Sequence, residues 1–135
     1  MNTSAQGLRV LVTAGAAGIG RAIAQTFAAH GARVHICDAS PTALETCGRE
    51  QPDISRSLAD VSSVDEVDRL FADVKRELGG LDVLINNAGI AGPTAKVEDI
   101  QPADWERCIA VDLNGMFHCT RLAMPMLKAN GPERG

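Results

Sequence analysis

Tyrosine is absent from the 135 residues of this chain, and its aromatic side chains are limited to three phenylalanines and one tryptophan. Acid–base chemistry that depends on a phenol therefore has no group to carry it within these residues. The chain also lacks an apolar run of membrane-spanning length, and its polar start lacks a basic segment followed by an apolar one. We therefore expect no membrane segment and a cytoplasmic location.

Excess charge and metal-ligand patterns are also lacking. The net charge of -4 argues against a nucleic acid or an anionic membrane as partner. None of the three histidines is spaced with other ligands as a metal site requires, so we expect no metal. No CxxC pair occurs, which favours small buried or half-buried thiols over disulfides at Cys37, Cys47, Cys108 and Cys119.

What is present is a regular alternation of apolar strands and amphipathic helices. Strands are expected at residues 8–13, 33–38, 54–59 and 81–85, with the interrupted third one at an edge of the sheet. Helices are expected over residues 19–30, 41–49 and 64–78, followed by one long helix after Pro102. This alternation specifies a single α/β domain built on a doubly wound parallel sheet.

The helices carry further local signals. Ser63 and Glu66 form the pattern of a capping box at the start of the third helix. On the long helix, Trp105 is expected to pack in the core, and Pro125 is expected to bend or end the helix.

The turn between the first strand and the first helix, residues 13–20, contains three closely spaced glycines. Glycines let the backbone approach a ligand, and the exposed N–H groups of a helix start attract anions. A pyrophosphate therefore fits this turn, although glycines also serve helix packing and tight turns.

Asp38 ends the second strand, where a carboxylate can accept hydrogen bonds from both ribose hydroxyls of an adenosine. The same carboxylate would repel a 2'-phosphate, and residues 13–20 contain no Lys or Arg to attract one. We therefore expect NAD as cofactor rather than NADP.

At this point the chain resembles the short-chain dehydrogenase/reductase family over nearly its full length. The resemblance rests on residues 13–20, Asp38, the pair at 60–61, the Asn-Asn-Ala-Gly run at 86–89, and the pattern of residues 105–117. It implies a Rossmann-like sheet, incomplete, with four strands in the order 3-2-1-4 and flanking helices. The implied cofactor-binding residues are Thr13, Gly15, Ala17, Gly18, Ile19, Gly20, Asp38, Asp60, Val61, Asn87, Ala88, Gly89 and Val111.

The resemblance also implies a role for each part of this set. The glycine turn would cradle the pyrophosphate, Asp60 would meet the adenine amino group, and Val61 would meet the ring. Residues 86–89 would line the cofactor and brace the sheet. An alternative for Asp60 is to cap the helix that begins at Ser62 or Ser63.

Two residues depart from the family pattern. Ala14 stands where the family has Gly directly after the Thr, and Ala is the smallest available substitute. Asp112 stands where the family has its catalytic Asn, three residues before Gly115, and is the candidate catalytic residue. Asp112 either holds the family's proton-relay water through its backbone carbonyl or only braces the sheet.

The resemblance implies an oxidoreductase that transfers hydride between a nicotinamide cofactor and a secondary alcohol or ketone, with protons moved by a Tyr-x-x-x-Lys motif. Because the chain has no tyrosine, we expect residues 1–135 to be the NAD-binding, amino-terminal part, truncated before the catalytic Ser and that motif. A small-molecule substrate is then expected only in a full-length form, and the long helix is expected to form a homo-oligomer. The alternative is a non-catalytic nucleotide-binding or interaction module, inactive as the isolated chain.

Overall fold

The computed structural model describes residues 4–134, which form a sheet of four parallel strands. The strands are β1 (Arg9–Thr13), β2 (Arg33–Asp38), β3 (Ser55–Leu58) and β4 (Val83–Ile85). Their order is β3-β2-β1-β4, so the expected doubly wound sheet and the edge position of the third strand are confirmed. Because all strands are parallel, the turns that follow their carboxyl ends meet at one edge of the sheet.

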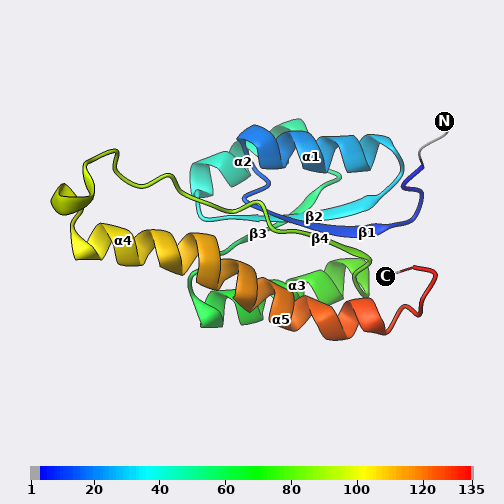
Figure 1. Cartoon of the computed structure of the whole chain (residues 1–135). Helices are drawn as coiled ribbons and strands as arrows, with labels where there is room; N and C mark the ends of the chain where they lie inside the picture. The colour runs from blue at the N-terminus through cyan, green and yellow to red at the C-terminus, as the bar shows by residue number, and fades with distance from the viewer. Residues whose placement is uncertain (1–3, 135) are drawn as a thin grey trace.

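Helices cover both faces of this sheet (Figure 1). One face carries α1 (Gly18–Ala29) and α2 (Pro41–Glu50), and the other carries α3 (Val64–Leu78) and α5 (Gly115–Lys128). Successive side chains of a strand point to opposite faces, so Val10 and Val12 pack with α1 and α2 whereas Leu11 packs with α3 and α5. Burial on both faces explains why β1 is a continuous apolar run.

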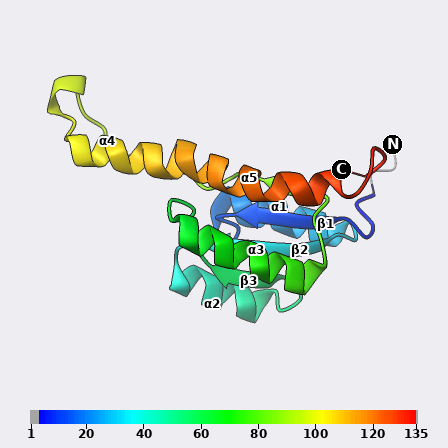
Figure 2. The ribbon, with the colours of Figure 1, turned by 90° about the horizontal axis from the view of Figure 1, so that it is seen from below.

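The segment after Pro102 is a nearly continuous helix with a π-helical segment inside it. It consists of α4 (Pro102–Ile109), the π-helical η2 (Ala110–Asn114) and α5, and a short 3-10 turn, η1 (Val97–Asp99), precedes it. Figures 1 and 2 show that α4 extends past the end of the sheet, so that α5 is the part that packs on the core.

Two expectations for this long helix are corrected. Trp105 is 60% exposed, so the prediction that it packs in the core is wrong; α4, which carries it, lies beyond the sheet. Pro125 does not end the helix, because α5 continues to Lys128. Pro125 and Arg121 are both exposed, so water can hydrate the Arg121 carbonyl that the proline leaves without an N–H donor.

The fourth strand is shorter and less buried than its sequence predicts. Residues 83–85 are only half-buried, since β4 pairs with β1 alone and forms an edge of the described sheet. Just before it, the buried Asp82 carboxylate accepts hydrogen bonds from the Arg9 side chain at 2.9 Å and from Arg134 at 3.1 Å. These bonds hold the pKa of Asp82 at about 2 and fasten the chain after α5 to the start of the sheet.

A buried polar chain links β2, β3 and α3. The His35 ring lies 2.7 Å from the hydroxyls of both Ser55 and Ser57, and the Ser57 hydroxyl donates to the Asp73 carboxylate at 2.6 Å. Since that hydroxyl donates to Asp73, it accepts from one nitrogen of the His35 ring. The Ser55 hydroxyl lies beside the other ring nitrogen and also donates to the Val34 carbonyl at 3.4 Å. Burial lowers the pKa of His35 to about 4, although the carboxylates of Asp73 and Glu77 oppose the shift.

We predict that the fold loses stability as the pH falls from about 6.5 to about 4. In this range the unfolded chain protonates His35 while the folded chain, with its lowered pKa, does not. The free energy of unfolding should fall by as much as about 3 kcal/mol, and urea unfolding across this range measures it. In His35→Gln the slope should largely disappear; an equal slope in the variant would show that other groups cause it.

Candidate functional site

The glycine turn leaves the carboxyl end of β1 through an unusual backbone conformation. Ala14 has a φ of +50° and Gly18 has a φ of +55°, both in the left-handed region. For a residue with a Cβ this conformation costs about 1–2 kcal/mol, which explains why glycine is the natural residue at position 14. The chain therefore makes the turn despite Ala14, with local strain at its first corner.

The amino-terminus of α1 is open to an anion. Ala17 precedes the helix and supplies no side-chain cap, and the first turn contains no acidic residue. Gly18 has nothing within 4 Å of the position that a Cβ would occupy. The helix start therefore presents free N–H groups and a positive dipole end beside open space, which fits a phosphate group.

The turn is fastened to the chain that follows β4. The Thr13 hydroxyl accepts hydrogen bonds from the main-chain N–H groups of Asn87, at 3.0 Å, and Ala88, at 2.9 Å. In the other direction, the Asn87 side-chain amide donates to the carbonyls of Thr13, at 3.1 Å, and Ala14, at 3.2 Å. Asn87 thus braces the turn.

Two of the glycines serve packing. A Cβ at Gly20 would overlap the Ala14 carbonyl and the Asn87 amide, and one at Gly15 would come within 2.5 Å of Ile36. The turn therefore combines two packed glycines, Gly15 and Gly20, with an exposed segment at residues 17–19.

A cleft of about 190 Å³ opens beside the turn, where β1, β2, β3 and β4 end. Of the residues expected to bind cofactor, it gathers Asp38, Asp60, Val61, Ala88, Gly89 and Val111. The remaining ones, in the turn and at Asn87, do not line this cleft. Ala14, Ala39, Ala59, Ile90 and Arg107 line it without having been expected, and the signal for Arg107 is its place one helical turn before Val111.

The two carboxylates of the cleft are held by hydrogen bonds. Asp38 accepts from the N–H groups of Ala16 at 3.2 Å and Ser40 at 3.0 Å. Asp60 accepts from the N–H and hydroxyl of Ser62 at 2.9 and 2.6 Å, and from Arg107 at 3.0 Å. Burial raises the pKa of Asp60, but the bonds from Ser62 and Arg107 outweigh it and leave the pKa below its usual value.

Asp60 is not the cap of the following helix. Ser63 caps α3 by accepting the Glu66 N–H at 3.3 Å, as the capping-box pattern predicts. The Glu66 carboxylate, however, accepts from the Asp60 N–H rather than from Ser63. The Asp60 side chain is therefore left facing the cleft, bound to Ser62 and Arg107.

Asp112 braces the loop after β4. One of its carboxylate oxygens accepts the Ile90 N–H at 2.7 Å. The residue lies in η2 and is exposed. A π-helical segment inside an α-helix is often found at a functional site, and here it carries both Asp112 and the cleft residue Val111.

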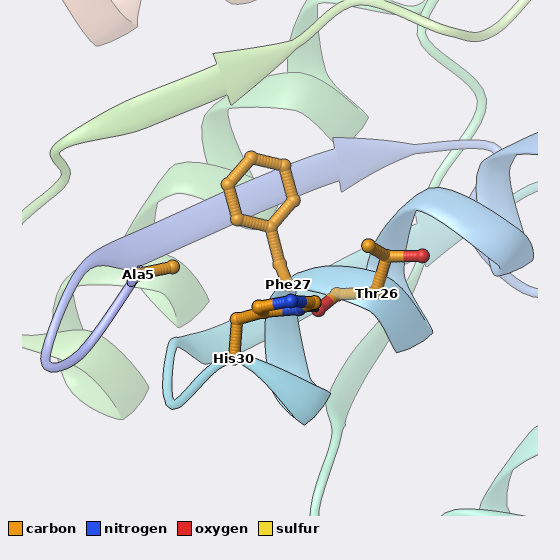
Figure 3. A pocket seen from close by; sticks show the side chains of 4 residues that line it. All are labelled: Ala5, Thr26, Phe27 and His30. Atoms are coloured by element: carbon orange, nitrogen blue, oxygen red, sulfur yellow. Dashed lines mark hydrogen bonds between the residues drawn. The ribbon is translucent and has the colours of Figure 1, made fainter. Parts of the chain in front are cut away.

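Other features of residues 4–134 add no second site. A small hollow lined by Ala5, Thr26, Phe27 and His30 lies at the carboxyl end of α1, at the far end of the sheet from the glycine turn (Figure 3). Within residues 4–134, no three His, Cys, Asp or Glu side chains gather as metal ligands would. Nor does any described helix have the length and apolar character needed to cross a bilayer.

Comparison with known proteins places this geometry in a family. The sequence model of the family described as short chain dehydrogenase matches residues 9–135. The chain belongs to the short-chain dehydrogenase family.

Individual relatives agree with this assignment. This chain is 38% identical over 132 residues to a tropinone reductase homolog of Arabidopsis thaliana. The match covers 94% of this chain and 50% of the relative. The chain is 35% identical over 127 residues to D-beta-hydroxybutyrate dehydrogenase of Cupriavidus necator, covering 90% and 48% respectively.

A solved structure matches the fold. The crystal structure of 3-ketoacyl-(acyl-carrier-protein) reductase from Brucella melitensis, complexed with NADH, superposes with a TM-score of 0.90 at 31% identity. That match covers 95% of this chain and 53% of the reductase. The chain thus spans about half the length of the relatives that it matches and corresponds to their amino-terminal half.

Replacing Thr13 with Val should lower the free energy of unfolding by about 1–3 kcal/mol. The change leaves the N–H groups of Asn87 and Ala88 without their acceptor, in a part-buried position. Urea unfolding measures the loss, with Thr13→Ser as a matched control that keeps the hydroxyl. A Val variant as stable as the Ser variant would contradict the bracing role of this hydroxyl.

Proposed function

We propose that this short-chain dehydrogenase chain, residues 1–135, is the NAD-binding domain of an enzyme that transfers hydride between the cofactor and a secondary alcohol or ketone. The observation that carries the proposal is the uncapped start of α1 beside a cleft with two fixed carboxylates, Asp38 and Asp60. The first feature suits a pyrophosphate and the second suits an adenosine. The bound nicotinamide supplies the hydride donor or acceptor.

In the proposed complex, the pyrophosphate lies on the glycine turn and receives N–H groups from residues 17–20, while Thr13 and Gly15 set the shape of that turn. Asp38 accepts the ribose hydroxyls, and Asp60 accepts the adenine amino group. Val61 and Val111 form apolar walls for the adenine, and Ala88 and Gly89 bound the cleft on the side of β4. Asn87 contributes by holding the turn.

The proposed preference for NAD over NADP rests on the charge beside the ribose. Asp38 lines the cleft at the end of β2, and a 2'-phosphate would meet its negative charge. Arg107, the one arginine among the residues that line the cleft, is paired with Asp60. A free cation for a 2'-phosphate is therefore lacking among the residues that line the cleft.

Proton transfer is proposed to need groups that residues 1–135 do not contain. The chain has no tyrosine, the residue with which the family moves the proton. Asp112, at the position of the family's Asn, is proposed to support the site by holding the Ile90 N–H, while its backbone carbonyl remains a candidate for holding a water. The isolated chain is therefore expected to bind cofactor without turnover.

The four thiols favour a reducing compartment. Cys37, Cys47, Cys108 and Cys119 are all free, and burial raises the pKa of Cys37 to about 12 and that of Cys119 to about 11. Thiols in this state are typical of cytosolic proteins, so we propose the cytoplasm as the location.

Binding of NADH, followed by calorimetry, tests the cofactor proposal, and Asp38→Asn tests the ribose contact. Loss of the charge should raise the dissociation constant of NADH about tenfold and leave that of NADPH unchanged or lower it. Asp68→Asn, at an exposed carboxylate on α3, is the control and should change neither value. No binding of NADH by the unmodified chain would contradict the function, and equal losses for both cofactors in Asp38→Asn would contradict the preference.

We also propose that the chain self-associates through the exposed apolar face of α4, η2 and α5. Trp105, Leu113 and Phe117, which are eight and four residues apart, are 60%, 55% and 62% exposed. Such a contiguous apolar face on a helix is typical of an interface.

Analytical sedimentation should therefore give a mass above that of the monomer at high concentration, and Phe117→Asp should shift it to the monomer. Val64→Asp is the matched control, because Val64 is exposed at the first turn of α3, where an acid is tolerated. A monomeric unmodified chain, or a Phe117→Asp variant that associates as before, would contradict this interface.

A further inference from the structure

Arg107 connects two walls of the cleft that are far apart in the sequence. It lies on α4, and its guanidinium donates to the Asp60 carboxylate at 3.0 Å and to the Ser62 hydroxyl at 2.9 Å. Asp60 and Ser62 belong to the turn after β3. All three residues are therefore joined in one small network, and two of them, Asp60 and Arg107, line the cleft itself.

This network leaves Asp60 with little freedom. One carboxylate oxygen accepts both the N–H and the hydroxyl of Ser62, while the other accepts Arg107. The Ser62 hydroxyl donates its proton to Asp60 and accepts from Arg107, so the hydrogen bonds close a ring. A carboxylate oxygen accepts about two hydrogen bonds. The oxygen bound to Arg107 therefore retains room for one more donor.

The positive charge of Arg107 also limits which groups can bind Asp60. An adjacent cation favours the ionised form of a carboxylate, which accepts hydrogen bonds and donates none. Only a donor, such as an exocyclic amino group, can therefore bind Asp60 in the cleft. A 6-oxo group at the same place would bring two acceptors together with no hydrogen between them.

We propose that Arg107 is a positioning residue that makes the cleft select a 6-aminopurine over a 6-oxopurine by holding the Asp60 carboxylate in place as a hydrogen-bond acceptor. This inference rests on the proposed binding of the adenosine half of NAD in the cleft. It adds a specificity role for a residue of α4, an element that otherwise lies beyond the sheet.

The test compares NADH with reduced nicotinamide hypoxanthine dinucleotide, which differs from it by carrying an oxo group in place of the amino group. Calorimetry on the 135-residue chain should give an affinity for NADH at least about tenfold higher. In Arg107→Met this ratio should fall below about threefold, because the freed carboxylate can turn away from the purine. Arg107→Lys should restore part of the ratio, since it keeps the charge without the two-pronged geometry.

A second measurement needs no cofactor. Carbon NMR of the Asp60 carboxyl should show a higher pKa in Arg107→Met and an unchanged pKa in Arg69→Met, the control at an exposed arginine of α3. If Arg107→Met weakens both dinucleotides equally, or leaves the pKa of Asp60 unchanged, the positioning role is wrong although the proposed function stands. If the unmodified chain binds NADH without discriminating between the two dinucleotides, the selectivity is likewise refuted; if it binds neither, the proposed function fails as well.

Discussion

The hydrogen bonds between Thr13 and the chain after β4 hold the site together. Thr13 and Asn87 lie 74 positions apart, yet the Thr13 hydroxyl accepts main-chain N–H groups after β4, and the Asn87 amide returns two bonds to the glycine turn. These contacts join the carboxyl ends of two neighbouring strands, β1 and β4. The left-handed corner at Ala14, the open start of α1 and the near wall of the cleft all take their positions from this connection.

Stability and function occupy opposite ends of this sheet. The edge with the glycine turn contains a strained alanine and an uncapped helix start, each of which has a cost that a bound dinucleotide would offset. The other end contains Asp82, buried and bound by Arg9 and Arg134. Between them, Leu11 and its neighbours fill the core on both faces. The sheet is thus buried on both faces, whereas its edge at the glycine turn has an open helix start and a cleft.

The long helix contributes residues to the cleft and to the loop after β4. Its π-helical segment carries Val111 into the cleft and turns Asp112 toward the loop after β4, while α4 brings Arg107 to Asp60. The side chains of Trp105 in α4 and Phe117 in α5 are exposed. The chain spans about half the length of the relatives that it matches, and β4 pairs only with β1 in the described sheet.

Local sequence determined the order of the elements, the parallel sheet, the edge position of β3 and the cap at Ser63, because periodicity and turn chemistry act over a few residues. Tertiary structure alone decided that Asn87 braces the turn, that Trp105 is exposed and that Arg107 reaches Asp60. Each depends on where α4 and the loop before it lie relative to the sheet. A contact between residues 47 positions apart depends on that placement and leaves no periodic trace in the sequence.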